Sequence, residues 1–82
     1  MDCEGSLALG TLQFLADKPQ DAMAAFEKAW QKAETEPQQR DVADGVILTI
    51  RARDGVAASH DFMRSLVADG IPAAVERVSA SE

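Results

Sequence analysis

The sequence predicts an all-α domain built from antiparallel helical hairpins. Proline and glycine residues divide the 82-residue chain into segments of helical length, and these segments are rich in Ala, Leu, Glu, Gln, Lys and Arg. Within the segments, apolar residues recur at steps of three and four. The stretch 46–50 (VILTI) is β-branched, but the chain offers it no second strand, so we interpret it as the buried centre of a helix.

Five helices follow from the positions of the breaks. Proline is tolerated in the first turn of a helix and disfavoured inside one, so Pro19, Pro37 and Pro72 each indicate a helix start. Gly70 is expected to end the fourth helix in a left-handed conformation. The predicted helices cover residues 6–17, 19–34, 37–54, 56–69 and 72–80, the last a short cap, in one domain over 1–82 whose residues 1–5 are expected to be disordered. The short loops make consecutive helices antiparallel.

Each of the three central helices carries one apolar face. The predicted face residues are Ala22, Phe26, Ala29, Trp30 and Ala33 on the second helix, Val42, Val46 and Ile50 on the third, and Ala58, Phe62, Leu66 and Val67 on the fourth. Residues three and four apart lie on the same side of a helix, so these faces are expected to meet in a common core.

The chain also resembles itself at a separation of 36 residues. The matching pairs are Leu12 with Leu48, Phe14 with Ile50, Ala22 with Ala58, Phe26 with Phe62, and Trp30 with Leu66. The breaks between helices, near Asp17 and Asp54, come into register at nearly the same separation. A helix-turn-helix period in the thirties is typical of an α-solenoid.

The first of these two units resembles a tetratricopeptide repeat (TPR). The family places a Leu-Gly pair on its first helix, a tight turn, and then Ala, an aromatic residue and Ala at steps of four and three. Here these are Leu9 and Gly10, the turn 17–19, and Ala22, Phe26 and Ala29. Close packing explains the pattern, because small residues let two helices approach while Phe26 fills the space beside them.

The resemblance covers 4–36 well and 37–70 weakly. Ser6 and Gln13 replace family aromatics, and the second unit has Gly45 and Val46 in place of the Leu-Gly pair. The resemblance implies a short α-solenoid of about two and a half TPR-like repeats. Its predicted structural core comprises Leu9, Gly10, Ala22, Phe26, Ala29, Trp30, Ala58 and Phe62.

Members of the family bind peptides or helices on a concave face formed by the first helices. Carried over to the first unit, the resemblance gives the partner-binding residues Glu4, Leu7, Thr11, Phe14 and Leu15. We extend this predicted surface to the third helix with Asp44 and Ile50. The four apolar ones, Leu7, Phe14, Leu15 and Ile50, would be anchors, and Glu4 and Asp44 an acidic rim. An alternative stays open for Leu7, Phe14 and Leu15, which could simply pack against the third helix.

Composition argues against several classes of partner. The net charge is -6 and the 8 basic residues are dispersed, whereas nucleic-acid binding needs clustered Lys and Arg, so we expect no nucleic-acid partner. No apolar run approaches the roughly 18 residues that span a bilayer, so no membrane partner is expected. The single Cys3 cannot form an internal disulfide, which favours a cytoplasmic location.

Catalytic chemistry has few candidate groups. The chain has one His, one Cys and no Tyr, and Ser59, His60 and Asp61 are consecutive helix residues that point in different directions. His60 and Cys3 are far apart in the sequence, so no metal site or cofactor is expected. We predict that the chain is not an enzyme. An enzyme would need a site assembled at a subunit interface.

The expected function is therefore that of a protein–protein interaction module, an adaptor or a small chaperone that binds a partner segment, itself helical, on an apolar helical surface. In its small size and acidity the chain is similar to the TPR-like chaperones of bacterial secretion systems. The alternative is a structural or oligomerisation subunit of a larger assembly, and self-association is possible.

Overall fold

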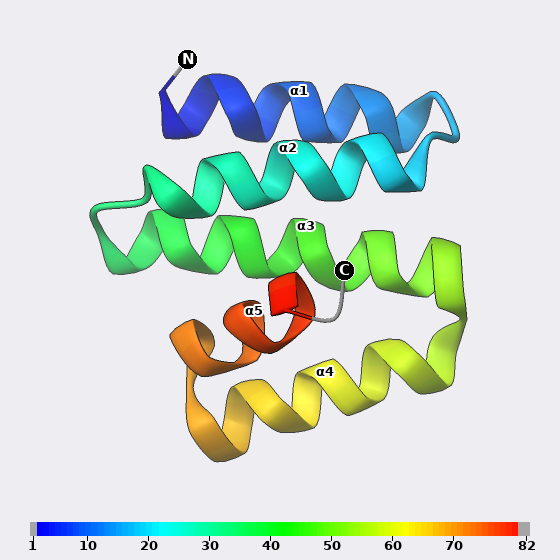
Figure 1. The fold of residues 1–82 in the computed structure, drawn as a ribbon, viewed down its shortest axis with the longest axis vertical. Coiled ribbons are helices and arrows are strands. Elements are labelled where there is room, and N and C mark those ends of the chain that lie inside the picture. Colours follow the sequence, from blue (N-terminus) through cyan, green and yellow to red (C-terminus); the bar gives the residue numbers. More distant parts are fainter. Residues whose placement is uncertain (1, 81–82) are drawn as a thin grey trace.

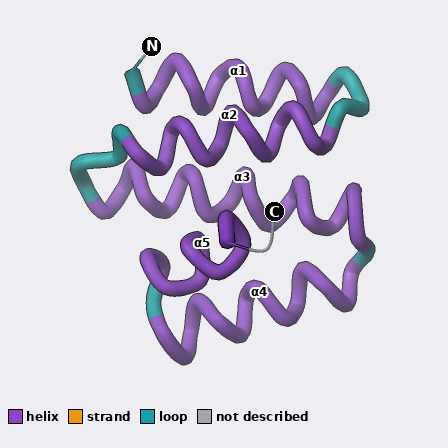
Figure 2. Tube along the Cα trace, in the orientation of Figure 1, coloured by secondary structure: helices purple, strands orange, loops and turns teal. Residues whose placement is uncertain are grey.

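The computed structural model describes residues 2–80, and the side chains of residues 2–78, and confirms the all-α prediction. Its elements are α1 (Cys3–Leu15), α2 (Pro19–Gln31), α3 (Glu36–Asp54), α4 (Val56–Asp69) and α5 (Ile71–Ala80). The β-branched stretch 46–50 is helical and lies inside α3. Figure 2 shows that only short loops separate the helices.

The first helix begins earlier than the sequence predicts. Residues 1–5 were expected to be disordered, but α1 starts at Cys3; Met1 lies outside the described residues. The side chain of Asp2 caps this helix, because its Oδ1 accepts a hydrogen bond from the backbone N–H of Gly5 at 2.7 Å. Cys3 is buried in the core, so packing as well as capping holds the first turn in place.

A capping box starts α3 one residue before Pro37. Thr35 Oγ1 accepts a hydrogen bond from Gln38 N at 3.3 Å, and Gln38 Oε1 accepts one from Thr35 N at 3.2 Å. Each side chain thereby satisfies a backbone N–H that the first turn leaves without a helical partner. Pro37 occupies the first turn, where its missing N–H costs nothing.

Single glycines connect the last three helices. Gly55 joins α3 to α4 with φ 99° and ψ 174°, and Gly70 joins α4 to α5 with φ 90° and ψ 169°. The positive φ predicted for Gly70 is confirmed, but its ψ is extended and not left-handed helical. Side-chain-bearing residues rarely adopt this combination, so glycine is needed where the chain reverses within one residue.

Helices α1 to α4 lie side by side in a row, each antiparallel to its neighbour (Figure 1). Helix α1 contacts α2 and α3, and α5 packs across α3 and α4. Because α1 and α3 are both antiparallel to α2, they run in the same direction. This arrangement of hairpins with a fifth helix added to the second one agrees with a short solenoid.

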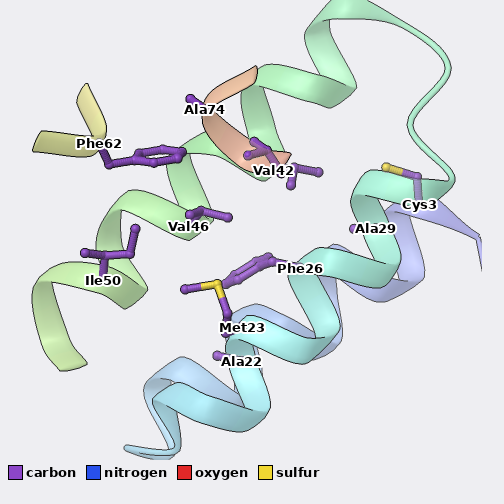
Figure 3. Packing of buried hydrophobic residues seen from close by; sticks show 11 residues of the cluster. Cys3, Ala22, Met23, Phe26, Ala29, Val42, Val46, Ile50, Phe62 and Ala74 are labelled. Carbon is purple, nitrogen blue, oxygen red and sulfur yellow. The ribbon is translucent and has the colours of Figure 1, made fainter. Parts of the chain in front are cut away.

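The core lies between the helices and takes residues from all five of them (Figure 3). Its buried residues are Cys3, Ala22, Met23, Phe26, Ala29, Val42, Val46, Ile50, Phe62, Ala74 and Val75. Of the predicted repeat core, Trp30 and Ala58 are half-buried against this cluster. Two predictions were wrong: Leu9 is 37% exposed because it lies on the outer side of the first helix, and Val67 is 90% exposed because it points away from α3 and α5.

The burial pattern repeats with the same 36-residue separation as the sequence. In α1 the buried or half-buried residues include Cys3, Ser6, Leu7, Gly10, Gln13 and Phe14, and the positions 36 residues later in α3, namely Gln39, Val42, Ala43, Val46, Thr49 and Ile50, are buried or half-buried as well. Leu12 and Leu48, also 36 apart, are both exposed. The two hairpins therefore turn equivalent faces to the core.

Candidate functional site

The ring of Phe26 is clamped between two glycines on neighbouring helices. A Cβ atom added to Gly10 of α1 would lie 2.7 Å from Phe26 Cε1, and one added to Gly45 of α3 would lie 2.5 Å from the same atom. Real side chains do not approach so closely, so both glycines are needed for this packing. Phe26 of α2 therefore packs against both α1 and α3, and the two glycines allow these helices to lie close to its ring.

An open hollow of about 350 Å³ lies above this ring, between α1 and α3. It is lined by Leu7, Ala8 and Thr11 of α1, by Phe26 of α2, and by Asp41, Asp44, Gly45 and Leu48 of α3. The floor is apolar, and Leu48 on its wall is 51% exposed. We call the surface that follows these two helices the α1–α3 groove.

The rim of the groove is acidic. Asp41 and Asp44 are exposed on α3, and Glu4 is exposed on α1 one turn before Ala8. Among the described residues, those that line the hollow include no Lys and no Arg. Arg40, which lines the adjoining hollow together with Asp41 and Asp44, is paired with Glu36 at 3.0 Å. Negative charge therefore exceeds positive charge at the end of the groove where α1 and α3 begin.

The pKa of the buried Cys3 thiol is affected by nearby carboxylates. Burial raises the pKa of Cys3, and the carboxylates of Asp2, Glu4 and Asp41 raise that pKa further. The last of these lies on α3, so the acidic side chains of both helices act on one region. At neutral pH the thiol is protonated and behaves as a small apolar core group.

Three of the predicted partner-binding residues line the hollow: Leu7, Thr11 and Asp44. Thr11 is exposed and donates a hydrogen bond from Oγ1 to the carbonyl oxygen of Leu7 at 2.9 Å, which fixes the rotamer of its hydroxyl. Glu4 lies one turn to one side of them and Leu15, 77% exposed, one turn to the other. The α1 part of the predicted surface is therefore largely contiguous.

One predicted anchor, Ile50, was wrong, and a second, Phe14, is half-buried. Ile50 is buried in the core, on the side of α3 that faces α4 and α5, and is not available to a partner. Phe14 is half-buried and packs against the core. The alternative that the sequence left open was packing of Leu7, Phe14 and Leu15 against the third helix. Leu7 and Phe14 are half-buried against the core, whereas Leu15 is 77% exposed.

Sequence reasoning missed Ala8, Asp41, Gly45 and Leu48 as lining residues. A signal for two of them was present, since Asp41 and Leu48 lie three residues before and four residues after the predicted Asp44 and share one side of α3 with it. The wall formed by Gly45 could not be found without the position of Phe26, because a glycine in a helix carries no periodic signal of its own.

The remaining candidate catalytic and metal-binding residues of the described part of the chain were also located. His60 is exposed, and Ser59 is buried with its Oγ donating to the carbonyl oxygen of Val56 at 2.7 Å. Within residues 2–80, no group of three or more His, Cys, Asp or Glu side chains is placed to hold a metal ion. None of the described helices is long and apolar enough to cross a membrane.

A second hollow lies between α3, α4 and α5, over Ile50 and Phe62. The charged residues near it are paired within the domain: Arg77 contacts Asp69 at 2.6 Å, and Arg53 contacts Asp54 at 3.0 Å. This hollow therefore offers less unpaired charge to a ligand than the α1–α3 groove does.

No protein-family model, curated protein or solved structure matches the chain. The resemblance to the TPR family is therefore carried by the residues of this chain alone.

Proposed function

We propose that the chain is a protein-interaction module whose α1–α3 groove receives a helical segment with apolar and basic side chains. The single observation that carries this proposal is a groove with an apolar floor and an acidic rim, set between two parallel helices. An enclosed catalytic pocket would converge polar groups on one point, whereas this surface is open and elongated.

The length of the groove suits a short helix. The lined hollow follows α3 from Asp41 to Leu48, which is about 10 Å at about 1.5 Å per residue. A partner helix of about two turns can place apolar side chains, three and four residues apart, against Leu7, Ala8 and Leu48. These are the contacts that an amphipathic helix makes in a groove between two others.

The charge of the rim selects the partner. Asp41 and Asp44 line the hollow, which has no basic residue among its lining side chains, and Glu4 lies on α1 one turn before the lining residue Ala8. Lys or Arg on the partner would be steered to this end and would fix the direction of the bound segment. A nucleic acid is disfavoured by the same charge, because its phosphates would be repelled.

We further propose that the two hairpins are TPR-like, that the chain has no catalytic activity, and that it acts as a cytoplasmic adaptor or small chaperone. The 36-residue recurrence of burial and the Gly10–Phe26 contact support a repeat of this kind. The unpaired Cys3 suits a reducing compartment.

The test is a selection of helical peptides with randomised faces from a display library, followed by affinity measurements on purified variants. We expect selected peptides to combine Leu-like residues with Lys or Arg. Asp44→Lys should weaken their binding about 5–10-fold, since one attraction becomes a repulsion. Glu76→Lys, an equal charge change on exposed α5, is the matched control and should leave affinity unchanged to first order.

A second pair of variants tests the apolar wall. Leu48→Lys should lower the affinity, whereas Val67→Lys, at a more exposed site on α4, should not. Selection of acidic peptides only, or equal effects of Asp44→Lys and Glu76→Lys, would show that the α1–α3 groove is not the binding surface.

A further inference from the structure

Helix α1 has a second apolar surface, on the side turned away from the rest of the domain. It consists of Gly5, Leu9, Leu12 and Ala16, which follow one another at steps of four, three and four, and is here called the edge stripe. Gly5 is half-buried, and Ala16 is the C-cap residue that follows the helix. Leu12 is 64% exposed and Leu9 is 37% exposed. Figure 1 shows α1 as the outermost helix at one end of the row.

The composition of α1 is that of a helix covered on all sides. From Cys3 to Leu15 its one charged residue is Glu4. A surface helix normally carries charged residues on its solvent side, and a helix that is apolar all round is normally buried. Helices α2 and α3 cover one side of α1, which leaves the edge stripe without a counterpart within residues 2–80.

The repeat register indicates what kind of surface the edge stripe is. The equivalent positions 36 residues later are Asp41, Gly45, Leu48 and Ala52. In α3 this side faces the preceding hairpin, because Gly45 lies against Phe26 and Leu48 lines the groove shared with α1. The edge stripe is therefore the side of α1 against which another hairpin would pack. At the other end of the row, α5 packs onto the second hairpin.

We propose that a second copy of this chain covers the edge stripe, with the two α1 helices antiparallel about a two-fold axis. The stripe reads small, Leu, Leu, small, and such a pattern is complementary to itself when reversed. Leu9 then faces Leu12 of the other copy, and Gly5 faces Ala16. A two-fold interface requires this self-complementarity, since each copy presents the same surface.

Charge favours the antiparallel direction. A parallel pair would place Asp2 and Glu4 beside their own copies, where like charges repel. In the antiparallel pair they lie near the other copy's Lys18 as well as its Asp17, so the repulsion is largely balanced. The groove stays open in this dimer, because Ala8 and Thr11 belong to the neighbouring side of α1.

The interface is small. Helix α1 has 13 residues, so the contact is about 20 Å long, and the area falls below that of a standard stable interface. The dimer is therefore a weak one, with a dissociation constant on the order of 100 µM.

Sedimentation of the full chain from about 10 µM to about 1 mM tests the proposal, because this range brackets the expected dissociation constant. The wild type should pass from monomer to dimer. Leu12→Glu should stay monomeric with unchanged circular dichroism, and Val67→Glu, the same charge change on exposed α4, should dimerise like the wild type. A wild type that is monomeric throughout, or a Leu12→Glu chain that still dimerises, would overturn the proposal.

Two further experiments test the face and the direction. Leu48→Glu changes the groove and should leave dimerisation intact. If Leu48→Glu abolishes dimerisation and Leu12→Glu does not, the contact lies in the groove and the proposal is overturned. In a Cys3→Ala background, oxidation of mixed Gly5→Cys and Ala16→Cys chains should give the mixed disulfide. Predominant Gly5→Cys homodimers would indicate parallel helices and refute the antiparallel arrangement.

Discussion

Replacing Gly45 by Ala probes the packing on which the groove is built. In an open helix this change stabilises by about 1 kcal/mol, since Ala favours the helix and Gly does not. Here the new Cβ would lie 2.5 Å from Phe26 Cε1 and 2.6 Å from Cζ. The ring cannot move away easily, because Gly10 packs against it as well. Overpacking of a filled core costs about 1–3 kcal/mol, so the net effect should be a loss of up to about 2 kcal/mol.

A double-mutant cycle separates the two contributions. Phe26→Leu removes the ring and destabilises by itself through the space that it leaves. In that background Gly45→Ala no longer meets an aromatic carbon, so the helix preference should dominate and the change should stabilise by about 0.5–1 kcal/mol. The expected coupling between the two sites is therefore about 1–3 kcal/mol.

Urea denaturation followed by circular dichroism at 222 nm measures all four free energies of unfolding. In a domain of this size, 1 kcal/mol corresponds to a shift of about 4–8 °C in the melting temperature, which provides a second readout. If Gly45→Ala stabilises the wild-type chain as it would an open helix, the clamp around Phe26 is refuted.

Three other perturbations have definite expected outcomes. The folded state raises the pKa of Cys3, so the unfolded chain loses the thiol proton at a lower pH. The free energy of unfolding should therefore fall as pH rises above about 8.5, and a Cys3→Ala chain should lack this pH dependence. Gly55→Ala and Gly70→Ala each force a side chain into a positive-φ, extended conformation and should cost about 1–3 kcal/mol by thermal melting. Gln38→Ala breaks one half of the capping box, and Thr35→Ala the other; each should cost about 0.5–2 kcal/mol in urea denaturation, and a loss below 0.2 kcal/mol would contradict the cap.

Much of the fold could be predicted from the sequence because its signals are local. Proline fixes a helix start by its own geometry, and Gly70 stops a helix by its own freedom, so four of the five helices begin within one residue of the predicted position. The first helix was the exception. Asp2 is a good capping residue, but the burial of Cys3 that secures the first turn depends on helices distant in the sequence.

The candidate site could be predicted only in part. The periodicity of α1 places Leu7 and Thr11 on one side whatever the tertiary structure is, and both line the groove. The prediction that Ile50 is a partner-binding anchor was wrong because α3 is covered from two sides, and periodicity alone does not say which side faces a partner. Gly45 was missed because its role is to yield space to Phe26, a contact that depends on how α2 and α3 meet.

Amide chemical-shift mapping of the chain with a selected basic, amphipathic peptide shows directly whether the α1–α3 groove binds a partner. The largest shifts should fall on residues 4–15 of α1 and 41–48 of α3, on the sides that line the groove. Shifts concentrated on α4 and α5 instead, with those two segments unmoved, would contradict the proposal that the α1–α3 groove binds a partner.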